Sequence, residues 1–227
     1  MKQIFIKHLM LTVFVIAAIT TCVTSVYAQE EKPPIEGYIG VGMPSGDDVS
    51  NQYGGLWLNL GAKYTVSESD KLTQKVFLDV SAGAKDTDFT TSNFLPATVT
   101  ARARVISLGY EATMVPNEDS PFYAGVGAAL GFVSNESDYD AGSGYQWRVN
   151  GVLTGKQHFI FDNNQMKFIP HLLVGYQIND KSGIEAKYRF INAKLPANNV
   201  NEFSSYPSAN PSTLSGMLTI VYTRKLN

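Results

Sequence analysis

The stretch FYAGVGAALGFV, residues 122–133, decides the fold because it separates into two unlike faces when every second residue is taken. One face is apolar and carries a phenylalanine at each end, and it consists of Phe122, Ala124, Val126, Ala128, Leu130 and Phe132. The other face is mostly glycine and alanine, and it consists of Tyr123, Gly125, Gly127, Ala129, Gly131 and Val133. A period of two indicates a β-strand. The stretch therefore predicts a strand with an apolar face backed by very small side chains.

The same alternation recurs along the chain, in LWLNLGAKYTV (residues 56–66), KVFLDVSAGAK (75–85) and IEAKYRF (184–190). Turn-like clusters separate these segments, namely SESD, PNED, DNNQ and NDKSG, and they alternate with longer polar loops. The sequence predicts an all-β chain in which successive strands pair antiparallel.

Three observations favour a membrane barrel over a soluble barrel with its apolar face inward. The ten steps from Phe122 to Phe132 project to about 25 Å at the tilt of barrel strands, which is the height of a lipid-facing band. The polar faces mix long charged side chains with many glycines, as an enclosed lumen requires. Short turns alternate with long loops, which is the asymmetry of outer-membrane barrels. A soluble ligand-binding barrel remains an alternative.

The first 28 residues have the pattern of a secretory signal peptide. Lys2 and Lys7 precede the apolar run of residues 9–19, and we expect cleavage after Ala28. The predicted domains are this signal, 1–28, and a barrel, 29–227. A membrane-anchoring helix is an alternative, but the run is shorter than the roughly 20 residues that a span needs. A lipoprotein anchor at Cys22 is another alternative.

Cleavage would remove two of the 18 Lys and Arg residues, against 20 Asp and Glu, so the mature chain would be acidic by four charges. This balance does not suggest nucleic-acid binding. Cleavage would also remove Cys22, the one cysteine, so no disulfide framework is expected in the mature protein.

The pattern leaves two strand numbers open. Bacterial single-chain barrels have an even number of strands, so eight strands are favoured and ten are the alternative. The segment 36–43 is the shortest candidate, and 99–112 changes phase partway, as a β-bulge would cause. Nine segments qualify: 36–43, 54–66, 72–85, 99–112, 121–133, 145–160, 166–178, 183–193 and 214–225.

The segments PFYAGVGAALGFV, SGIEAKYRF and the final GMLTIVYTRKL resemble the small outer-membrane β-barrel family of Gram-negative bacteria, the opacity-like and porin-like eight-stranded proteins. The resemblance implies an antiparallel up-and-down transmembrane barrel in the outer membrane. It implies outer-membrane lipid, lipopolysaccharide and the outer-membrane assembly machinery as partners. The chain departs from the family at its end, where Leu226 and Asn227 replace the usual final aromatic residue.

No catalytic, metal or cofactor site is predicted. The predicted mature chain has two histidines, His158 and His171, and neither lies in a pattern of the lipid-modifying barrel enzymes. No cluster of His, Cys, Asp and Glu has the spacing of metal ligands.

The predicted lumen carries more basic than acidic side chains. Buried charges must pair or meet water, so either acidic loops fold back as partners or water and anions enter. A salt-bridged plug is favoured over an anion-conducting pore, because an eight-stranded interior is just wide enough to be filled by side chains. The acidic loop residues are Asp47, Asp48, Asp86, Asp88, Glu136, Asp138 and Asp140. The expected interior network comprises Lys63, Lys75, Asp79, Lys85, Arg102, Arg104, Arg148, Glu185, Lys187 and Arg189, with Lys156 as a further cation.

The predicted function is a structural or adhesion-like surface role carried by the outer loops. The alternatives are a narrow channel for small anionic solutes, a lipid-modifying enzyme and a soluble ligand-binding barrel.

Overall fold

The computed structural model describes residues 35–90, 96–117, 120–141, 148–149, 152–153, 158–195 and 212–226, all within one compact unit, Pro34–Leu226. The predicted signal peptide and its cleavage site lie outside these residues.

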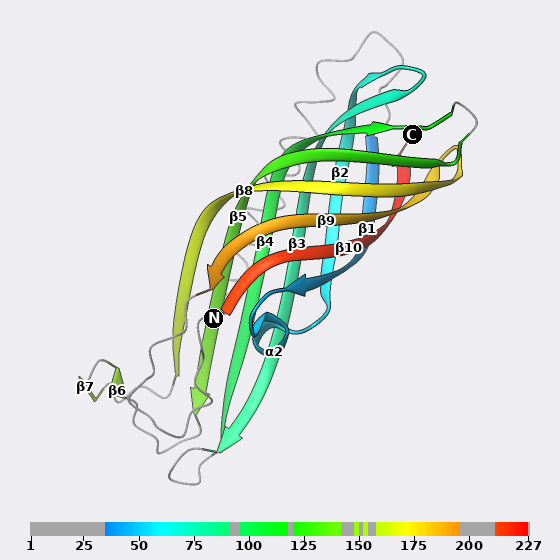
Figure 1. Cartoon of the computed structure of the whole chain (residues 1–227). Coiled ribbons are helices and arrows are strands. Elements are labelled where there is room, and N and C mark those ends of the chain that lie inside the picture. The colour runs from blue at the N-terminus through cyan, green and yellow to red at the C-terminus, as the bar shows by residue number, and fades with distance from the viewer. Residues whose placement is uncertain are drawn as a thin grey trace. The chain divides into compact units, whose positions relative to one another are not determined.

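The described residues form a closed eight-stranded antiparallel barrel (Figure 1). Each strand pairs with its neighbours in sequence, and β1 closes the barrel against β10. The strands are β1 (Ile35–Ser45), β2 (Trp57–Glu68), β3 (Leu72–Thr90), β4 (Pro96–Met114), β5 (Phe122–Ala141), β8 (His158–Asn179), β9 (Ser182–Leu195) and β10 (Ser212–Leu226).

The prediction of an eight-stranded up-and-down barrel is confirmed, and the ten-strand alternative is wrong. The false candidate is 145–160. Its described residues are two short strands, β6 (Arg148–Val149) and β7 (Val152–Leu153), which form a separate two-stranded sheet, and 158–160, which are the start of β8. The DNNQ segment is not a turn, because β8 runs through it as one strand of 22 residues paired with β5. The short candidate near 36–43 is a genuine strand, β1.

The predicted change of phase in β4 is also wrong. The β3–β4 ladder runs from Leu72↔Met114 to Thr90↔Pro96 without a register shift. Odd-numbered residues of β4 from Ala101 to Thr113 therefore face the interior throughout, which places the even-numbered ones outside.

The two ends of the barrel differ in their connections. One end holds the short turns at 69–71, 115–121 and 180–181, together with Ile35 and Leu226. The other holds the connections after β1, β3, β5 and β9; those after β1, β5 and β9 are longer, and the first of them contains the short helix α2 (Val49–Tyr53). We refer to them as the short-turn end and the long-loop end.

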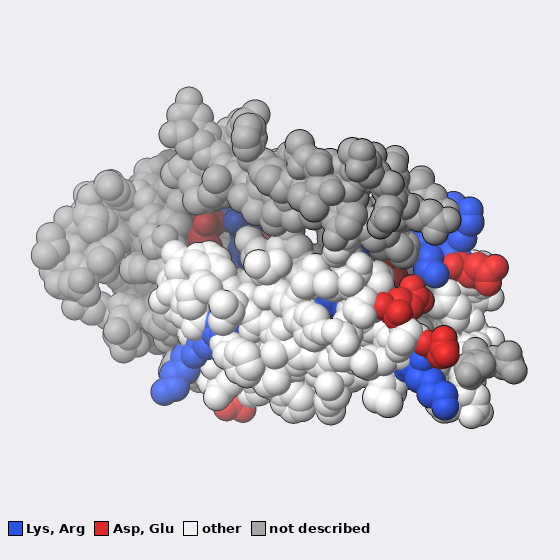
Figure 2. All heavy atoms as spheres, turned by 90° about the horizontal axis from the view of Figure 1, so that it is seen from above, with Lys and Arg blue, Asp and Glu red and all other residues white. Residues whose placement is uncertain are grey.

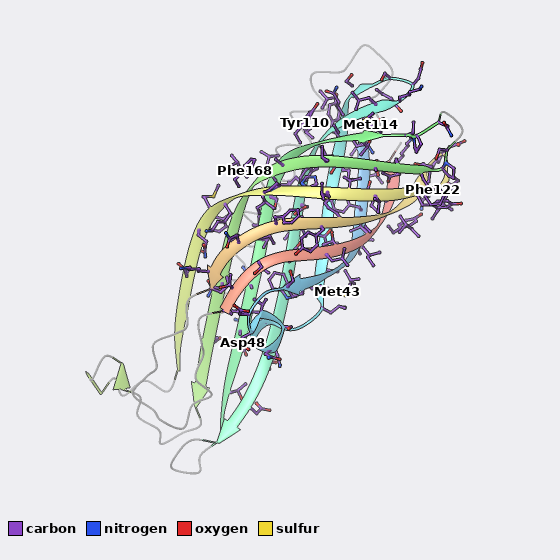
Figure 3. All side chains as sticks on the ribbon, viewed as in Figure 1. Met43, Asp48, Tyr110, Met114, Phe122 and Phe168 are labelled. Atoms are coloured by element: carbon purple, nitrogen blue, oxygen red, sulfur yellow. The ribbon has the colours of Figure 1, made fainter. Side chains whose placement is uncertain are left out.

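A belt of apolar side chains surrounds the barrel. Phe122, Val126 and Leu130 of β5 are about 60% exposed, as the alternation of residues 122–133 predicted. Met43, Met114 and Phe168 project from the outside of other strands (Figure 3). On the face seen in Figure 2, uncharged residues cover most of the described middle, and charged residues gather toward the ends.

Four adjacent strands are longer than the rest. The strands β3, β4, β5 and β8 have 19 to 22 residues, whereas β1, β2, β9 and β10 have 11 to 15. The long strands extend past the others toward the long-loop end (Figure 1). This extension is a polar sheet, with Asp86, Thr98 and Glu136 among its side chains.

An apolar layer fills the interior near the long-loop end. The helix α2 contributes Val49 and Tyr53, both buried, and the Asn135 amide donates a hydrogen bond of 3.3 Å to the Tyr53 hydroxyl. Further members come from the strands: Trp57, Ala103, Val105, Val133, Ile169, Ile191, Ala193, Leu195, Leu214 and Met217. In the described part of the chain, no helix combines the length and the hydropathy that a membrane crossing needs.

The apolar belt yields the first prediction. Val126→Arg places a charge near the middle of the belt and should cost about 2–4 kcal/mol of folding free energy in a bilayer. Urea unfolding of protein in phosphatidylcholine vesicles measures this cost. The control is Thr100→Arg, an outward position of the polar extension, for which we expect little change. Equal stability of the two variants would contradict a lipid-facing belt.

Candidate functional site: the charged interior

Four charged side chains meet in the middle of the barrel and form one cluster, Lys63, Glu111, Glu185 and Lys187. The Lys63 Nζ lies 2.6 Å from the Glu111 carboxylate and donates a 2.5 Å hydrogen bond to Glu185. The Lys187 Nζ donates to Glu111 over 2.8 Å. All four side chains are buried, and their formal charges sum to zero.

A second ion pair lies beside this cluster. The Arg189 guanidinium donates to Asp79 over 2.7 Å and to the Ser81 hydroxyl over 2.5 Å. The Asn59 amide donates to the same hydroxyl over 2.6 Å. Since Arg189 belongs to β9 and the other three residues to β2 and β3, these contacts tie opposite walls of the barrel together.

Aromatic side chains surround the cluster and exclude water from it. The Tyr123 hydroxyl donates to Glu185 over 2.8 Å, and the Lys187 Nζ lies 4.4 Å from the centre of the Phe77 ring. The His171 Nε2 lies 3.5 Å from Glu111, and its ring packs edge-on against Phe77. A cation over an aromatic face gains from the ring quadrupole, most of all when it is desolvated.

Glycines make room for these groups. A Cβ at Gly61 would lie 2.2 Å from the Tyr38 ring, and one at Gly127 would lie 2.5 Å from the His171 Nε2. Both distances are far below van der Waals contact. The small inward face of β5 is therefore the space that the interior side chains of other strands occupy.

A further ion pair lies toward the short-turn end, where the Lys75 Nζ donates to Glu36 over 2.6 Å. Both residues line a cavity of about 210 Å³, together with residues of the short turns. Tyr123 lines this cavity and donates a hydrogen bond to Glu185 of the buried cluster.

The structure places half of the ten predicted network residues in the buried interior, namely Lys63, Asp79, Glu185, Lys187 and Arg189. Lys75 lies at its short-turn end, half-buried. Lys85 is exposed and donates to the Asn51 carbonyl of α2 over 2.8 Å, so it does not join the cluster.

Three predicted members lie elsewhere. Arg102 and Arg104 point outward, because β4 keeps its phase. Arg148 belongs to β6, which is outside the barrel sheet, and its side chain is not among those described. Lys156 lies outside the described residues.

Among the described interior residues the charges balance, so the expected excess of positive charge is wrong there, and two acidic partners, Glu111 and Glu36, were missed. Glu111 was not assigned to the lumen from the sequence; in the structure the odd-numbered residues of 101–113 face inward at a constant period of two, which puts Glu111 inside and Arg102 and Arg104 outside. Glu36 was missed because its strand was the least secure candidate. Two of the loop acids, Glu136 and Asp138, contact Arg102, at 2.6 and 3.8 Å.

The geometry of the cluster is that of a plug. Within the described ranges, no group of three or more His, Cys, Asp and Glu side chains is placed to hold a metal ion. Each cation of the cluster contacts an acid directly, and a charge buried without a partner would cost several kcal/mol. The arrangement therefore holds strands together across the lumen and blocks its axis.

No protein-family model matches the sequence, and no curated protein matches it. Solved structures with a similar fold include Ail, the attachment invasion locus protein of Yersinia pestis, at 11% identity and a TM-score of 0.46 over 86% of this chain and 99% of Ail. They also include Neisserial surface protein A, at 13% identity and 0.36 over 85% and 95%, and CarO of Acinetobacter baumannii, at 10% identity and 0.38 over 84% and 97%. All three are small eight-stranded outer-membrane barrels, the group that the sequence resembles. The sheet itself establishes the fold, and no function is carried over from these proteins.

The buried cluster yields the second prediction. Glu111→Gln leaves two lysines to share Glu185, so it should lower the free energy of unfolding by about 3–5 kcal/mol. Glu136→Gln breaks a partly exposed pair with Arg102 and should cost at most about 1 kcal/mol. The measurement is the temperature at which the folded band disappears on a gel of samples heated in detergent. Similar melting of both variants would show that Glu111 is not buried among cations.

Proposed function

We propose that the chain is an outer-membrane barrel that conducts no solute and acts at the cell surface, through its long-loop end, in a structural or adhesion-like role. The single observation that carries this proposal is the sealed lumen, in which the neutral cluster around Lys63 and Glu111 lies next to an apolar layer. The apolar belt supports insertion in a bilayer. The proposal includes a signal peptide at 1–28, and lipopolysaccharide and the assembly machinery as partners.

The polar extension supports the surface role. Hydrogen-bonded strands hold residues of β3, β4, β5 and β8 beyond the apolar belt, where they face water rather than lipid. In outer-membrane barrels the longer loops are extracellular and the short turns periplasmic. The extension therefore serves as a rigid platform for whatever the surface loops contact.

The alternative of an anion channel is less well supported. An anion path needs cations that are free to meet a solute, but Lys63, Lys187 and Arg189 each contact a carboxylate. His171 gives no support to the lipid-modifying enzyme, because it is buried between Glu111 and Phe77 rather than placed at the rim.

The third prediction is that the purified protein gives no conductance steps in planar bilayers. The folded state is verified beforehand by slower migration of the boiled than of the unheated sample. Steady steps from such folded protein, with anion selectivity in a salt gradient, would favour the channel and contradict the plug.

The fourth prediction concerns orientation and uses the absence of cysteine from the predicted mature chain. A cysteine at Asp86, exposed on the polar extension, should react with a membrane-impermeant maleimide on intact cells. A cysteine at Asp70, exposed in a short turn, should react after the outer membrane is permeabilised and not before. Labelling in the reverse order would place the long-loop end in the periplasm and overturn the surface role.

A further inference from the structure

The cavity of about 210 Å³ at the short-turn end has a lining that is almost entirely polar, and we call it the short-turn cavity. Val115 is the one aliphatic residue in this lining, which otherwise consists of charged, hydroxyl and amide side chains from all eight barrel strands and their turns. A molecule in the short-turn cavity would therefore be recognised by polar contacts.

The charges that line the cavity differ between two opposite sides. One side is the turn between β2 and β3, where Glu68, Asp70 and Lys71 sum to one negative charge. The other side comprises the turn between β8 and β9 and the end of β10, where Lys181 and Lys225 sum to two positive charges. The two turns lie opposite each other, because two strands separate them in either direction around the barrel. The short-turn cavity thus has an acidic side and a basic side.

These charges are not neutralised within the described part of the chain. None of the five side chains forms an ion pair with another described residue, and four of them are exposed while Lys225 is half-buried. By contrast, Lys75 and Glu36, which also line the cavity, neutralise each other over 2.6 Å. The acidic and basic sides are therefore available to a ligand.

Hydroxyl groups line the cavity between its charged sides. Thr113 and Thr223 are both buried, and the Thr113 hydroxyl donates a hydrogen bond of 3.4 Å to the Thr73 carbonyl. The Thr223 hydroxyl has no hydrogen-bond partner among the described residues. A hydroxyl both donates and accepts, and a buried polar group is costly unless water or a ligand bonds to it. These hydroxyls suit a ligand that carries amide groups.

The volume of the cavity limits the size of the ligand. Pockets for drug-sized ligands measure about 300–1,000 Å³, so the short-turn cavity fits a smaller molecule. A simple anion would leave the acidic side without a partner, and a simple cation would leave the basic side without one. A small molecule with one charge of each sign and amide groups between them satisfies both sides and the hydroxyls.

We propose that the short-turn cavity binds a short peptide with free termini, of roughly two or three residues by the cavity volume. Its carboxylate lies beside Lys181 and Lys225, and its ammonium lies beside Glu68 and Asp70. This inference goes beyond the proposed function and does not rest on it, because the cavity binds its ligand whichever way the barrel is oriented in a membrane.

The fifth prediction concerns the two termini of the peptide. Folded, ¹⁵N-labelled protein in detergent micelles at low salt is titrated with trialanine, and the NMR amide signals of Ser182 and Thr223, which line the cavity, report binding. Trialanine should shift these signals. N-acetyl-trialanine, which lacks the ammonium, and trialanine amide, which lacks the carboxylate, should each bind at least fivefold more weakly.

Two double variants assign each terminus to its side of the cavity. Lys181→Gln with Lys225→Gln should weaken trialanine at least fivefold and remove its advantage over trialanine amide. Glu68→Gln with Asp70→Asn should remove its advantage over N-acetyl-trialanine. Arg224→Gln is the matched control, because Arg224 is exposed next to Lys225 without lining the cavity, and it should bind trialanine as the parent does.

The blocked peptides test the proposal on the parent protein alone, so a variant that does not fold leaves it open to refutation. Absence of shifts at Ser182 and Thr223 would overturn it. Equal binding of N-acetyl-trialanine and trialanine would identify a site for simple anions, and equal binding of trialanine amide a site for simple cations. Tighter binding of glycerophosphoethanolamine than of trialanine would identify a lipid headgroup as the ligand, and each of these results overturns the proposal.

Discussion

The ion pairs of Lys63 with Glu111 and Glu185 are the interaction on which the rest of the structure depends. A buried lysine is tolerated when carboxylates replace its water, and both carboxylates then need the second cation, Lys187, for neutrality. These residues come from β2, β4 and β9, so the cluster can form only in a closed barrel with the observed register. A shift of one residue in any of these strands would turn its charged side chain toward lipid. The cluster thus stabilises the barrel and also specifies its register.

The same constraint explains the composition of the strands. An eight-stranded interior has little space, so each long side chain on one wall needs a small residue on another. Gly61 accommodates the Tyr38 ring, and Gly127 accommodates His171. Toward the long-loop end, α2 and apolar side chains fill the described part of the interior in place of the ion pairs. The glycine-rich inward face of β5 and the charged inward face of β9 therefore complement each other in filling the lumen.

Alternation along single strands allowed the fold to be predicted. A strand with one face toward lipid and one toward the interior shows both environments in its alternate residues. This alternation gave the lipid face of β5 and the inward positions of Lys63, Asp79 and Lys187. Alternation failed to place the residues whose orientation depends on how the strands pair with one another. The segment ATVTARARV puts Arg102 and Arg104 outside because β4 extends past the apolar belt, where an outward charge meets water and Glu136. In the sequence alone, an arginine that points outward beyond the apolar belt cannot be distinguished from an arginine that points into the lumen and is followed by a β-bulge. The partners of a lumen cation depend on the register around the whole barrel, which no single segment encodes.

The unequal lengths of the strands raise the question of which backbone groups find a hydrogen-bond partner. Where β3, β4, β5 and β8 continue beyond the belt, they pair with one another, whereas the edge of β3 that faces β2 and the edge of β8 that faces β9 have no ladder partner among the described residues. Lipid cannot satisfy a backbone N–H, so an unpaired edge at belt height is costly. Pro170 removes one such donor, and Gln165 supplies a side-chain bond in place of a backbone bond. Between β8 and β9, a proline without an N–H and a side-chain hydrogen bond therefore stand where a continuous ladder would need backbone donors.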